Sequence, residues 1–268
     1  MSALTFKLKQ ALAQRVDCSA LTPDLLAGKS LSEIAAIELQ CGRFKLRADS
    51  VFAISGHDAS EIIFENGSAK LDSIGQGMSQ GRITVKGDAG SYLGLQMKKG
   101  EIVVHGNADA FVASGMAGGM IQVHGDVGDF LAAALPGDRK GMRGGIVIIK
   151  GNAGDRAGDQ MRRGLLLIEG DVGSYCASRM LAGTIGVLGQ VGDYVGYGMR
   201  RGTLLVTKTP ALHATLQDCG THTLPFLRLM FKSFAGLPSR FAEMRHDRVQ
   251  RYAGDLAADG KGEILVLR

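Results

Sequence analysis

The stretch Met78-Ser79-Gln80-Gly81-Arg82-Ile83-Thr84-Val85 is the first of seven copies of one phrase, in which a Met stands three residues before a Gly that opens a Gly-x-aliphatic-x-aliphatic segment. The opening glycines are separated by 19, 19, 26, 19, 19 and 19 residues, so the period is 19 with one insertion of seven residues. The methionines are Met78, Met97, Met116, Met142, Met161, Met180 and Met199, and the glycines are Gly81, Gly100, Gly119, Gly145, Gly164, Gly183 and Gly202. A fixed period of this length is typical of a solenoid, in which stacked repeats share one core.

The interior of the repeat indicates which solenoid it is. Counting the opening Gly as position one, positions three and five are aliphatic in every copy and alternate with variable residues, which is a strand pattern. Position seven is Gly in six copies, and a residue suited to tight turns usually follows it. These following residues are Asp88, Asn107, Asp126, Asn152, Asp171 and Gln190. We therefore predict an all-β fold, a parallel, right-handed β-helix of about seven regular 19-residue coils, with an irregular N-terminal cap and a partly helical C-terminal cap.

The repeat divides the chain into three parts. Residues 1–77 are predicted to form the N-terminal cap and irregular first coils, with a capping box at Ser30 and Glu33 that opens a short helix. Residues 78–208 are the β-helix, and the seven extra residues at 134–140 are expected to bulge from one corner as a loop. Within the N-terminal part, the stretch 62–64 resembles a degenerate coil. Residues 209–268 are predicted to be the C-terminal cap and docking segment.

Composition agrees with an ordinary globular chain. Its 268 residues are 45% apolar and carry a net charge of +5, and no run of 18 apolar residues occurs. The four cysteines form no Cys-x-x-Cys pair, which suits a reducing compartment. We expect a cytoplasmic protein without membrane association.

The residues that most resemble a catalytic or ligand site have structural explanations. Glycines that recur coil after coil, with no helix after them, do not form a nucleotide loop. His105 and His124 share position six of adjacent coils, about 4.8 Å apart, but no carboxylate accompanies them and we interpret them as surface residues. The Asp88, Asp126 and Asp171 column is interpreted as corner residues that bond local backbone. We predict no catalytic residue and no metal site.

The most distinctive polar feature is a set of basic residues directly after the Met of four coils. They are Lys98, Lys99, Arg143, Arg162, Arg163, Arg200 and Arg201, which we call the basic strip. Because coils stack, the strip should follow one corner and could attract an acidic partner or an anionic carrier. A solvated edge that keeps the protein soluble explains it equally well.

Aromatic residues occupy position twelve of five coils, and Arg156 breaks the column. We interpret this column as packing or a docking face. Nucleic acid is not expected as a partner, because the aromatic residues lie in another register from the basic strip.

Two segments outside the regular coils are candidates for docking other proteins. The insertion contributes Pro136, Asp138 and Arg139. The dense apolar cluster near the C-terminus contributes Phe226, Phe231 and Phe234, which would close the last coil or meet another protein.

Three features together resemble the C subunit of formylmethanofuran dehydrogenase and its bacterial relative in the formyltransferase/hydrolase complex. They are the repeat Met-x-x-Gly-x-Ile-x-Val-x-Gly-Asp-Ala-Gly, the insertion ending Gly137-Asp138-Arg139-Lys140-Gly141-Met142, and the tail Gly254-Asp255-Leu256 with Gly260-Lys261-Gly262-Glu263-Ile264-Leu265. The resemblance covers nearly the whole chain. The glycine-patterned repeat alone is also similar to the C-terminal domain of the glutamate synthase large subunit.

This resemblance implies a non-catalytic scaffold subunit in one-carbon (formaldehyde) oxidation. In that family, a formyltransferase subunit moves formyl groups between tetrahydromethanopterin and a methanofuran-type carrier, and a metal-dependent hydrolase subunit releases formate. The carrier and the metal ions are therefore expected in partner subunits and not in this chain. Two alternatives stay open: a glutamate-synthase-like linking domain of an amidotransferase complex, and a β-helix that is an enzyme by itself.

Overall fold

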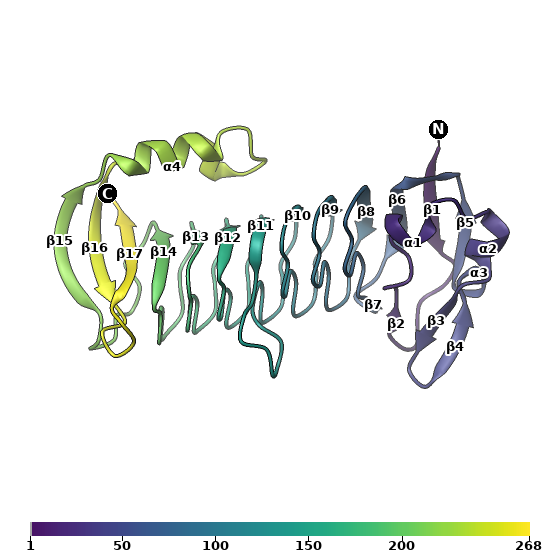
Figure 1. The fold of residues 1–268 in the computed structure, drawn as a ribbon, viewed down its shortest axis with the longest axis horizontal. Coiled ribbons are helices and arrows are strands. Elements are labelled where there is room, and N and C mark those ends of the chain that lie inside the picture. Colours follow the sequence, from purple (N-terminus) through teal and green to yellow (C-terminus); the bar gives the residue numbers. More distant parts are fainter. Residues whose placement is uncertain (1) are drawn as a thin grey trace.

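Parallel strands stacked side by side run along most of the molecule in the computed structural model, which describes residues 2–268 (Figure 1). Seven of them follow one another in sequence and in space. Their bounds are β8 Arg82–Gly87, β9 Glu101–Val104, β10 Met120–Val123, β11 Arg143–Ile149, β12 Arg163–Ile168, β13 Thr184–Val187 and β14 Arg201–Val206. Each neighbouring pair aligns equivalent positions, as where Ile83 lies opposite Ile102. The prediction of a mostly β chain with a large parallel sheet is confirmed.

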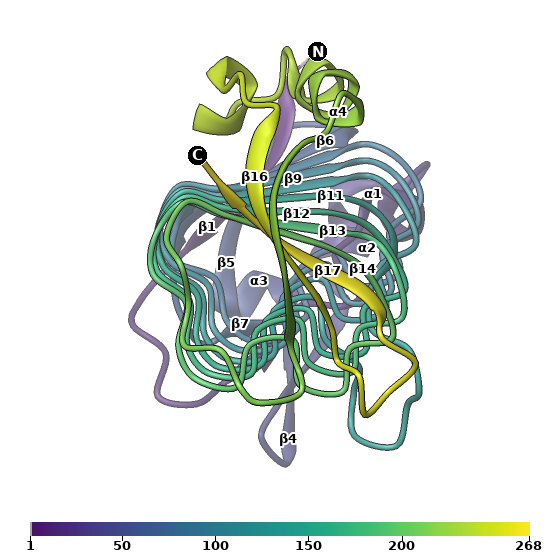
Figure 2. The ribbon, with the colours of Figure 1, turned by 90° about the vertical axis from the view of Figure 1, so that its left-hand side faces the viewer.

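The chain returns between these strands through a second, shorter ladder. Six residues at position nine form isolated parallel bridges from one coil to the next: Ala89, Ala108, Val127, Ala153, Val172 and Val191. Viewed along the long axis, the coils appear as nested outlines (Figure 2). The aliphatic side chains at positions three and five of β8 to β14 are fully buried, and so are the seven methionines. The interior is therefore a continuous apolar core.

Each Met packs against the opening Gly of the following coil. Gly100 has a φ of +92°, and a Cβ built on it would lie 2.5 Å from Met78 Cε and 2.7 Å from the carbonyl oxygen of Gly81. The same arrangement recurs from coil to coil, and Gly119 faces Met97 Cε at 2.8 Å. Only Gly combines this backbone conformation with this proximity, so the contact explains why Met and Gly occur together in the repeated phrase.

The corner residues that follow position seven form a ladder between coils, and not the local backbone bonds that we predicted. Asp88 Oδ1 accepts a hydrogen bond of 2.8 Å from the backbone N–H of Asn107, and Asn107 Oδ1 accepts one of 2.8 Å from Asp126. The pattern continues through Asn152, Asp171 and Gln190. A local turn would leave these N–H groups at the stacked corners unpaired, which explains the difference. Carboxylates alternate with amides along the ladder, so no two carboxylates occupy adjacent coils.

The N-terminal region continues the sheet at one end of the molecule. Its elements are β1 Ala3–Leu8, β2 Val16–Asp17, α1 Pro23–Leu26, α2 Leu31–Ala35, β3 Glu38–Cys41, β4 Phe44–Arg47, α3 Ala48–Val51, β5 Phe52–Ser55, β6 Asp58–Gly67 and β7 Leu71–Asp72. Strand β6 pairs in parallel with β8, with Ile62 opposite Ile83, so the stretch 62–64 belongs to the stacked sheet. The capping box at Ser30 and Glu33 is present, and the helix that it opens ends at Ala35.

The C-terminal region closes the other end. Its elements are β15 Gln217–Thr223, α4 Phe226–Phe234, the 3₁₀ helix η1 Arg240–Glu243, β16 Arg248–Gly254 and β17 Lys261–Leu267. Strand β17 pairs in parallel with β14, with Gly202 opposite Gly262, and β16 and β15 then add antiparallel strands. The longest helix of the described chain, α4, has nine residues, and none described there is long and apolar enough to span a membrane.

Helix α4 folds back over the outer face of the sheet (Figures 1 and 2). Phe231 and Phe234 are buried there with Ile148 and Leu167, in a second apolar core outside the coils. The prediction that these two phenylalanines dock a partner is therefore wrong, because they pack on the sheet of their own chain. A Cβ on Gly186 would lie 2.7 Å from the ring of Phe241, so η1 rests directly on the strand backbone.

Candidate functional site

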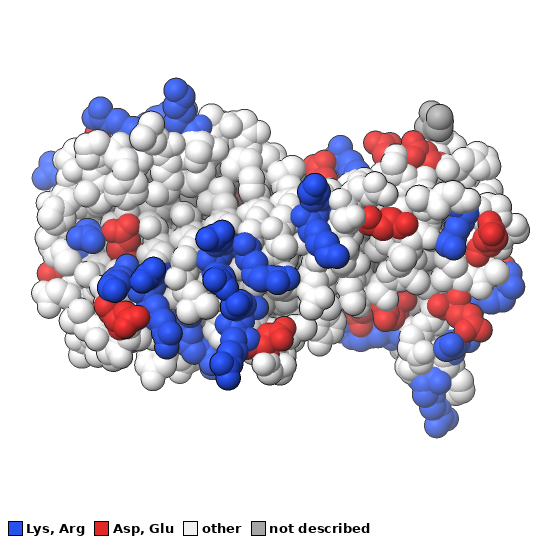
Figure 3. Space-filling model, in the orientation of Figure 1, with Lys and Arg blue, Asp and Glu red and all other residues white. Residues whose placement is uncertain are grey.

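The basic strip is held in place by backbone hydrogen bonds between coils. The N–H of Lys98 donates to the carbonyl of Met78 at 2.8 Å, and the N–H of Arg162 donates to the carbonyl of Met142 at 2.8 Å. Arg200 bonds the carbonyl of Met180 in the same way, at 2.9 Å. All seven side chains of the strip are exposed. Figure 3 shows Lys and Arg side chains gathered on the face of the molecule that carries β9 to β14.

The strip is interrupted twice, and two hollows lie along it, one of them at the second interruption. Small or apolar residues replace the cations at Ala117 and Gly118, and again at Leu181 and Ala182. One hollow of about 390 Å³ is lined by Arg162, Arg163, Leu181, Ala182, Arg200, Arg201 and Asp259. Another of about 390 Å³ lies beside the insertion and is lined by Gln96, Gly115, Asp138, Arg139, Lys140 and Arg143.

Within residues 2–268, no member of the strip lies within salt-bridge distance of a carboxylate. Arg143 is oriented by its own chain, because its Nη2 donates to the carbonyl of Gly115 at 3.2 Å. Guanidinium groups bind carboxylates and phosphates in a planar, bidentate manner. An extended row of them can hold a flexible polyanion at several points along its length.

Two further lysines belong with the strip and were missed in the sequence. Lys261 lies opposite Arg201 in the pairing of β17 with β14. Lys140 lines the hollow beside the insertion. The signal for Lys261 was present, because Lys261-Gly262 repeats the cation that precedes an opening Gly in the phrase. Lys140 lies in the insertion, outside the 19-residue repeat, so the repeat could not predict its position beside the strip.

The insertion leaves and rejoins its coil through hydrogen bonds to the next one. Ala134 N–H donates to the carbonyl of Asp159 at 3.2 Å, and Gly141 N–H donates to that of Gln160 at 2.9 Å. The candidate docking residues Pro136, Asp138 and Arg139 are exposed between these anchors. Of the C-terminal candidates, Phe226 is 42% exposed at the start of α4.

The paired histidines differ from each other. Their ring centroids are 4.9 Å apart, His105 is exposed and His124 is half-buried. Burial, helped by Lys150 and His105, lowers the pKa of His124. The Nε2 of His124 lies 2.8 Å from Nε2 of Gln122. Burial and the neighbouring cation therefore favour a neutral His124 ring, whose Nε2 can accept a hydrogen bond from the Gln122 amide.

The aromatic residues at position twelve form stacked groups. Phe111 and Phe130 stack with centroids 4.8 Å apart, and so do Tyr175 and Tyr194. Arg156 separates these two groups of rings, as predicted, and its guanidinium lies 4.6 Å above the ring of Tyr175. All six residues of the column have φ between 58° and 64°, a left-handed conformation in which equivalent side chains leave each coil in the same direction.

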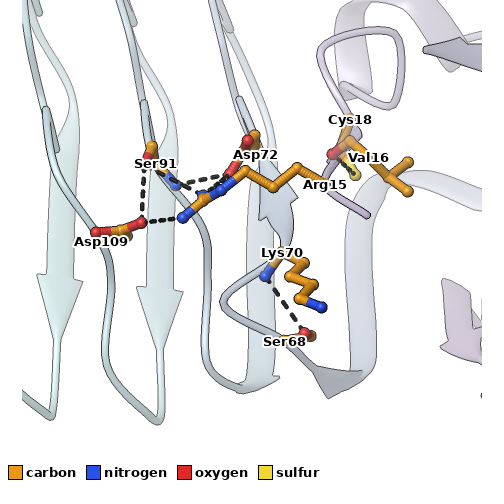
Figure 4. A network of polar contacts seen from close by, with 8 residues as sticks. All are labelled: Arg15, Val16, Cys18, Ser68, Lys70, Asp72, Ser91 and Asp109. Atoms are coloured by element: carbon orange, nitrogen blue, oxygen red, sulfur yellow. Dashed lines mark hydrogen bonds and ion pairs between the residues drawn. The ribbon is translucent and has the colours of Figure 1, made fainter. Parts of the chain in front are cut away.

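Arg15 ties the N-terminal region to the first coils (Figure 4). Its guanidinium donates to Asp72 at 2.7 Å and to Asp109 at 2.5 Å, and Ser91 Oγ donates to Asp109 at 3.0 Å. Hydrogen bonds to Asp109 and Asp72 raise the pKa of Arg15. Burial opposes ionisation of Asp109, but the bonds from Arg15 and Ser91 outweigh it, so the pKa of Asp109 is lowered. The network crosses two coil boundaries.

Comparison with known proteins agrees with this architecture. Residues 66–219 match the family model described as GXGXG motif. The chain is 42% identical over 89 residues to the C subunit of the formyltransferase/hydrolase complex Fhc of Methylorubrum extorquens. It is 34% identical over 99 residues to the C subunit of the tungsten-containing formylmethanofuran dehydrogenase 2 of Methanothermobacter thermautotrophicus. These two alignments cover 33% and 35% of this chain, and 34% and 37% of the relatives.

A solved structure extends the similarity to the full length. One chain of the formyltransferase/hydrolase complex FhcABCD of Methylorubrum extorquens, crystallised with methylofuran, superposes with a TM-score of 0.94 at 41% identity, over 98% of both chains. The repeat and the match to its model therefore define a protein of the GXGXG motif class. Within that class, the chain belongs to the family of the C subunit of the formyltransferase/hydrolase complex, which is related to the C subunit of formylmethanofuran dehydrogenase.

Proposed function

We propose that the chain is a non-catalytic scaffold subunit of a formyltransferase/hydrolase complex. That complex would move formyl groups from tetrahydromethanopterin to a methanofuran-type carrier and on to formate. The observation that carries the proposal is the superposition over 98% of both chains with a subunit of such a complex. Its β-helix of about seven coils, between caps at residues 1–77 and 209–268, would hold the formyltransferase and the metal-dependent hydrolase subunits at a fixed separation.

The use of polar side chains inside this chain supports a scaffold role. The corner residues Asp88, Asn107 and Asp126 accept hydrogen bonds from the next coil. Asp72 and Asp109 are occupied by Arg15. These carboxylates and amides serve the stacking of coils and the attachment of the N-terminal region. The carrier and the metal ions would accordingly belong to the partner subunits.

Co-purification tests the assignment. The tagged chain is expressed with candidate formyltransferase and hydrolase subunits, purified, and weighed by native mass spectrometry. We expect one assembly that contains all of them and that converts formyl-tetrahydromethanopterin to formate, whereas the isolated chain has neither activity. Recovery with glutaminase and flavin or iron–sulfur subunits would instead support the glutamate-synthase-like role. Formyl transfer or hydrolysis by the isolated chain would contradict the non-catalytic role.

The basic strip suggests a second task within the same complex. We infer that it holds or guides the anionic, glutamate-rich tail of the carrier between the two active sites. The exposed guanidinium groups without carboxylate partners, in hollows of about 390 Å³, support this inference. An electrostatic contact of this kind weakens with ionic strength.

Charge reversal tests this task separately. The variant with Lys98, Lys99, Arg162 and Arg163 changed to Glu should assemble normally but lose carrier and coupled activity. A control with Lys29 and Arg43 changed to Glu, both exposed in the N-terminal region, should retain them. Unchanged carrier content and unchanged coupled activity in an intact complex of the first variant would show that the strip is only a solvated edge.

A further inference from the structure

Helix α4 has two apolar faces, of which its own chain covers one. Leu227, Phe231 and Phe234 are buried against the sheet. Leu229 is 72% exposed and Phe226 is 42% exposed, although both are large apolar residues. They stand three positions apart, so they are neighbours on the helix surface and form one continuous ridge.

Basic residues surround this ridge. Arg228 and Lys232 are exposed on the same helix, and Arg240 and Arg245 follow in the segment that leads away from it. Between residues 224 and 247 the sequence contains two carboxylates, those of Glu243 and Asp247. Asp247 forms an ion pair with Arg228, so the four cations still outnumber the carboxylates by two. Figure 3 shows Lys and Arg side chains along the upper edge, where Figure 1 places α4.

We propose that the outer face of α4, formed by Phe226, Arg228, Leu229 and Lys232, docks another subunit of the complex. The matching surface would be an apolar pocket rimmed by carboxylates. A central pair of large apolar side chains within a charged rim is the usual composition of a protein interface. The existence of a partner rests on the function proposed above; the place of contact rests on α4 alone.

The anchoring of α4 favours this role. Its inner face belongs to a core that includes Ile148, Leu167, Leu205 and Leu265 of the sheet, so the helix is presented in a fixed position. A surface that is ordered before binding loses little conformational entropy when it docks. Residues 2–268 leave Leu229 uncovered, so its apolar surface is free to be buried by another molecule. A second copy would bring two basic helices together, which favours an acidic partner.

The experiment compares exposed leucines. Leu229→Asp, alone and with Phe226→Asp, is introduced into the tagged chain, which is co-expressed with the other subunits. The controls are Leu25→Asp and Leu256→Asp, at residues that are 54% and 56% exposed elsewhere on the chain. We expect at least a tenfold loss of one partner subunit with the α4 variants, on the order seen for truncation of an interface hot spot. The controls should recover that subunit as the wild type does.

Three further readouts keep the outcomes distinct. The thermal midpoint of each isolated variant should equal that of the wild type, because Leu229 is already exposed; a fall would attribute the loss to folding and overturn the proposal. If the wild type recovers partners and Leu229→Asp recovers them equally well, the proposal is wrong while the complex stands. If the wild type recovers none, the proposed function itself fails. Concentration-dependent self-association of the isolated chain that Leu229→Asp abolishes would identify a second copy as the occupant and also overturn the proposal.

Discussion

The Cε methyl carbon of Met78 lies 2.5 Å from the point at which a Cβ of Gly100 would stand. One residue of each coil thus fills the space that the missing side chain of the next coil leaves. Because the contact is repeated along the solenoid, it fixes both the Met and the Gly of the phrase. The 19-residue period of the sequence therefore reflects a contact that recurs once in each coil.

Replacement of Gly100 by Ala should therefore destabilise the protein strongly. The Cβ would collide with Met78 Cε and with the carbonyl oxygen of Gly81, and it would strain a φ of +92°. We expect a loss of about 2–4 kcal/mol, from the left-handed conformation and the overpacking together. Urea unfolding followed by circular dichroism measures it. Gly77→Ala is the control, because Gly77 also has a positive φ, +67°, but nothing lies within 4 Å of its Cβ position. Equal losses at the two sites would show that backbone strain, and not the Met contact, governs the glycine.

Asn107→Asp tests the alternation of carboxylates and amides in the corner ladder. The new carboxylate can still accept the hydrogen bond from Asp126, but it would stand between Asp88 and Asp126 in adjacent coils. Like charges at the spacing of stacked strands should cost about 1 kcal/mol at neutral pH, because both neighbours are near the surface. The loss should shrink as salt is added, because salt screens the repulsion between exposed charges. Gln190→Asp, which gains Asp171 as its one ladder neighbour, should lose less.

Phe241→Ala should loosen the segment that covers the outer face of the sheet. Phe241 is fully buried, and truncation of such a ring costs about 3 kcal/mol or more. Proteolysis within residues 224–246 should become faster. Gly186→Ala should also destabilise the native chain, since its Cβ would meet the Phe241 ring at 2.7 Å. In the Phe241→Ala background the same change should cost less, with a coupling of about 1 kcal/mol. Strict additivity would mean that the ring does not rest on Gly186.

The Arg15 network should make attachment of the N-terminal region depend on pH. The pKa of Asp109 is lowered in the folded chain, so its contribution is present above its unfolded pKa of about 3.9 and is lost as pH falls through the lower folded value. Because the side chains of Arg15 and Asp109 are 49% and 37% exposed, the contribution should be about 1 kcal/mol or less. Asp109→Asn should lower the thermal midpoint at pH 7, and the difference from wild type should shrink as the pH falls below the unfolded pKa of Asp109. A difference that does not shrink in acid would contradict an electrostatic role.

The four thiols should divide into two classes. Burial raises the pKa of Cys176 to about 12 and also raises that of Cys18, whereas Cys41 and Cys219 are half-buried. Since the thiolate is the reactive form, a thiol reagent at pH 8 should label two cysteines quickly in the native protein and four in denaturant. Mass mapping of the labelled peptides identifies them. Fast labelling of Cys176 in the folded chain would show that its coil opens readily.

The sequence predicted the parts of the structure that the repeat controls. The alternation at positions three and five identified the stacked strands, because a residue that faces the core must be apolar in every coil. The same logic placed the basic strip after the Met of four coils. It could not locate β17, where Gly262, Ile264 and Val266 repeat the pattern once, far from the other copies. One isolated copy of the pattern has no periodic spacing by which it could be recognised.

The outer face of the sheet was beyond sequence reasoning for a different reason. Apolar residues such as Ile148 and Leu167 occupy outward positions in some coils and not in others. Their meaning depends on α4, which covers them from another part of the chain. Phe231 is buried by this long-range contact. The local pattern offered only closure of the last coil or contact with another protein. The alternation of Asp with Asn or Gln at the corners can be read in the sequence. The hydrogen bonds that these side chains accept from the next coil could be identified only from the backbone geometry.

The pairing of Gly202 with Gly262 also constrains how the protein is made. Most strands of the solenoid pair with a neighbour only one repeat away, so a coil can add to the preceding one soon after it leaves the ribosome. Strand β14 is different, because the strand that covers its free edge ends at Leu267. Until β17 has emerged, the newest coil keeps a row of unpaired backbone groups, which is the kind of edge that recruits other chains. Nascent chains that terminate before β17 would therefore keep the edge of β14 exposed. Pairing of this one strand protects the finished protein from edge-to-edge aggregation.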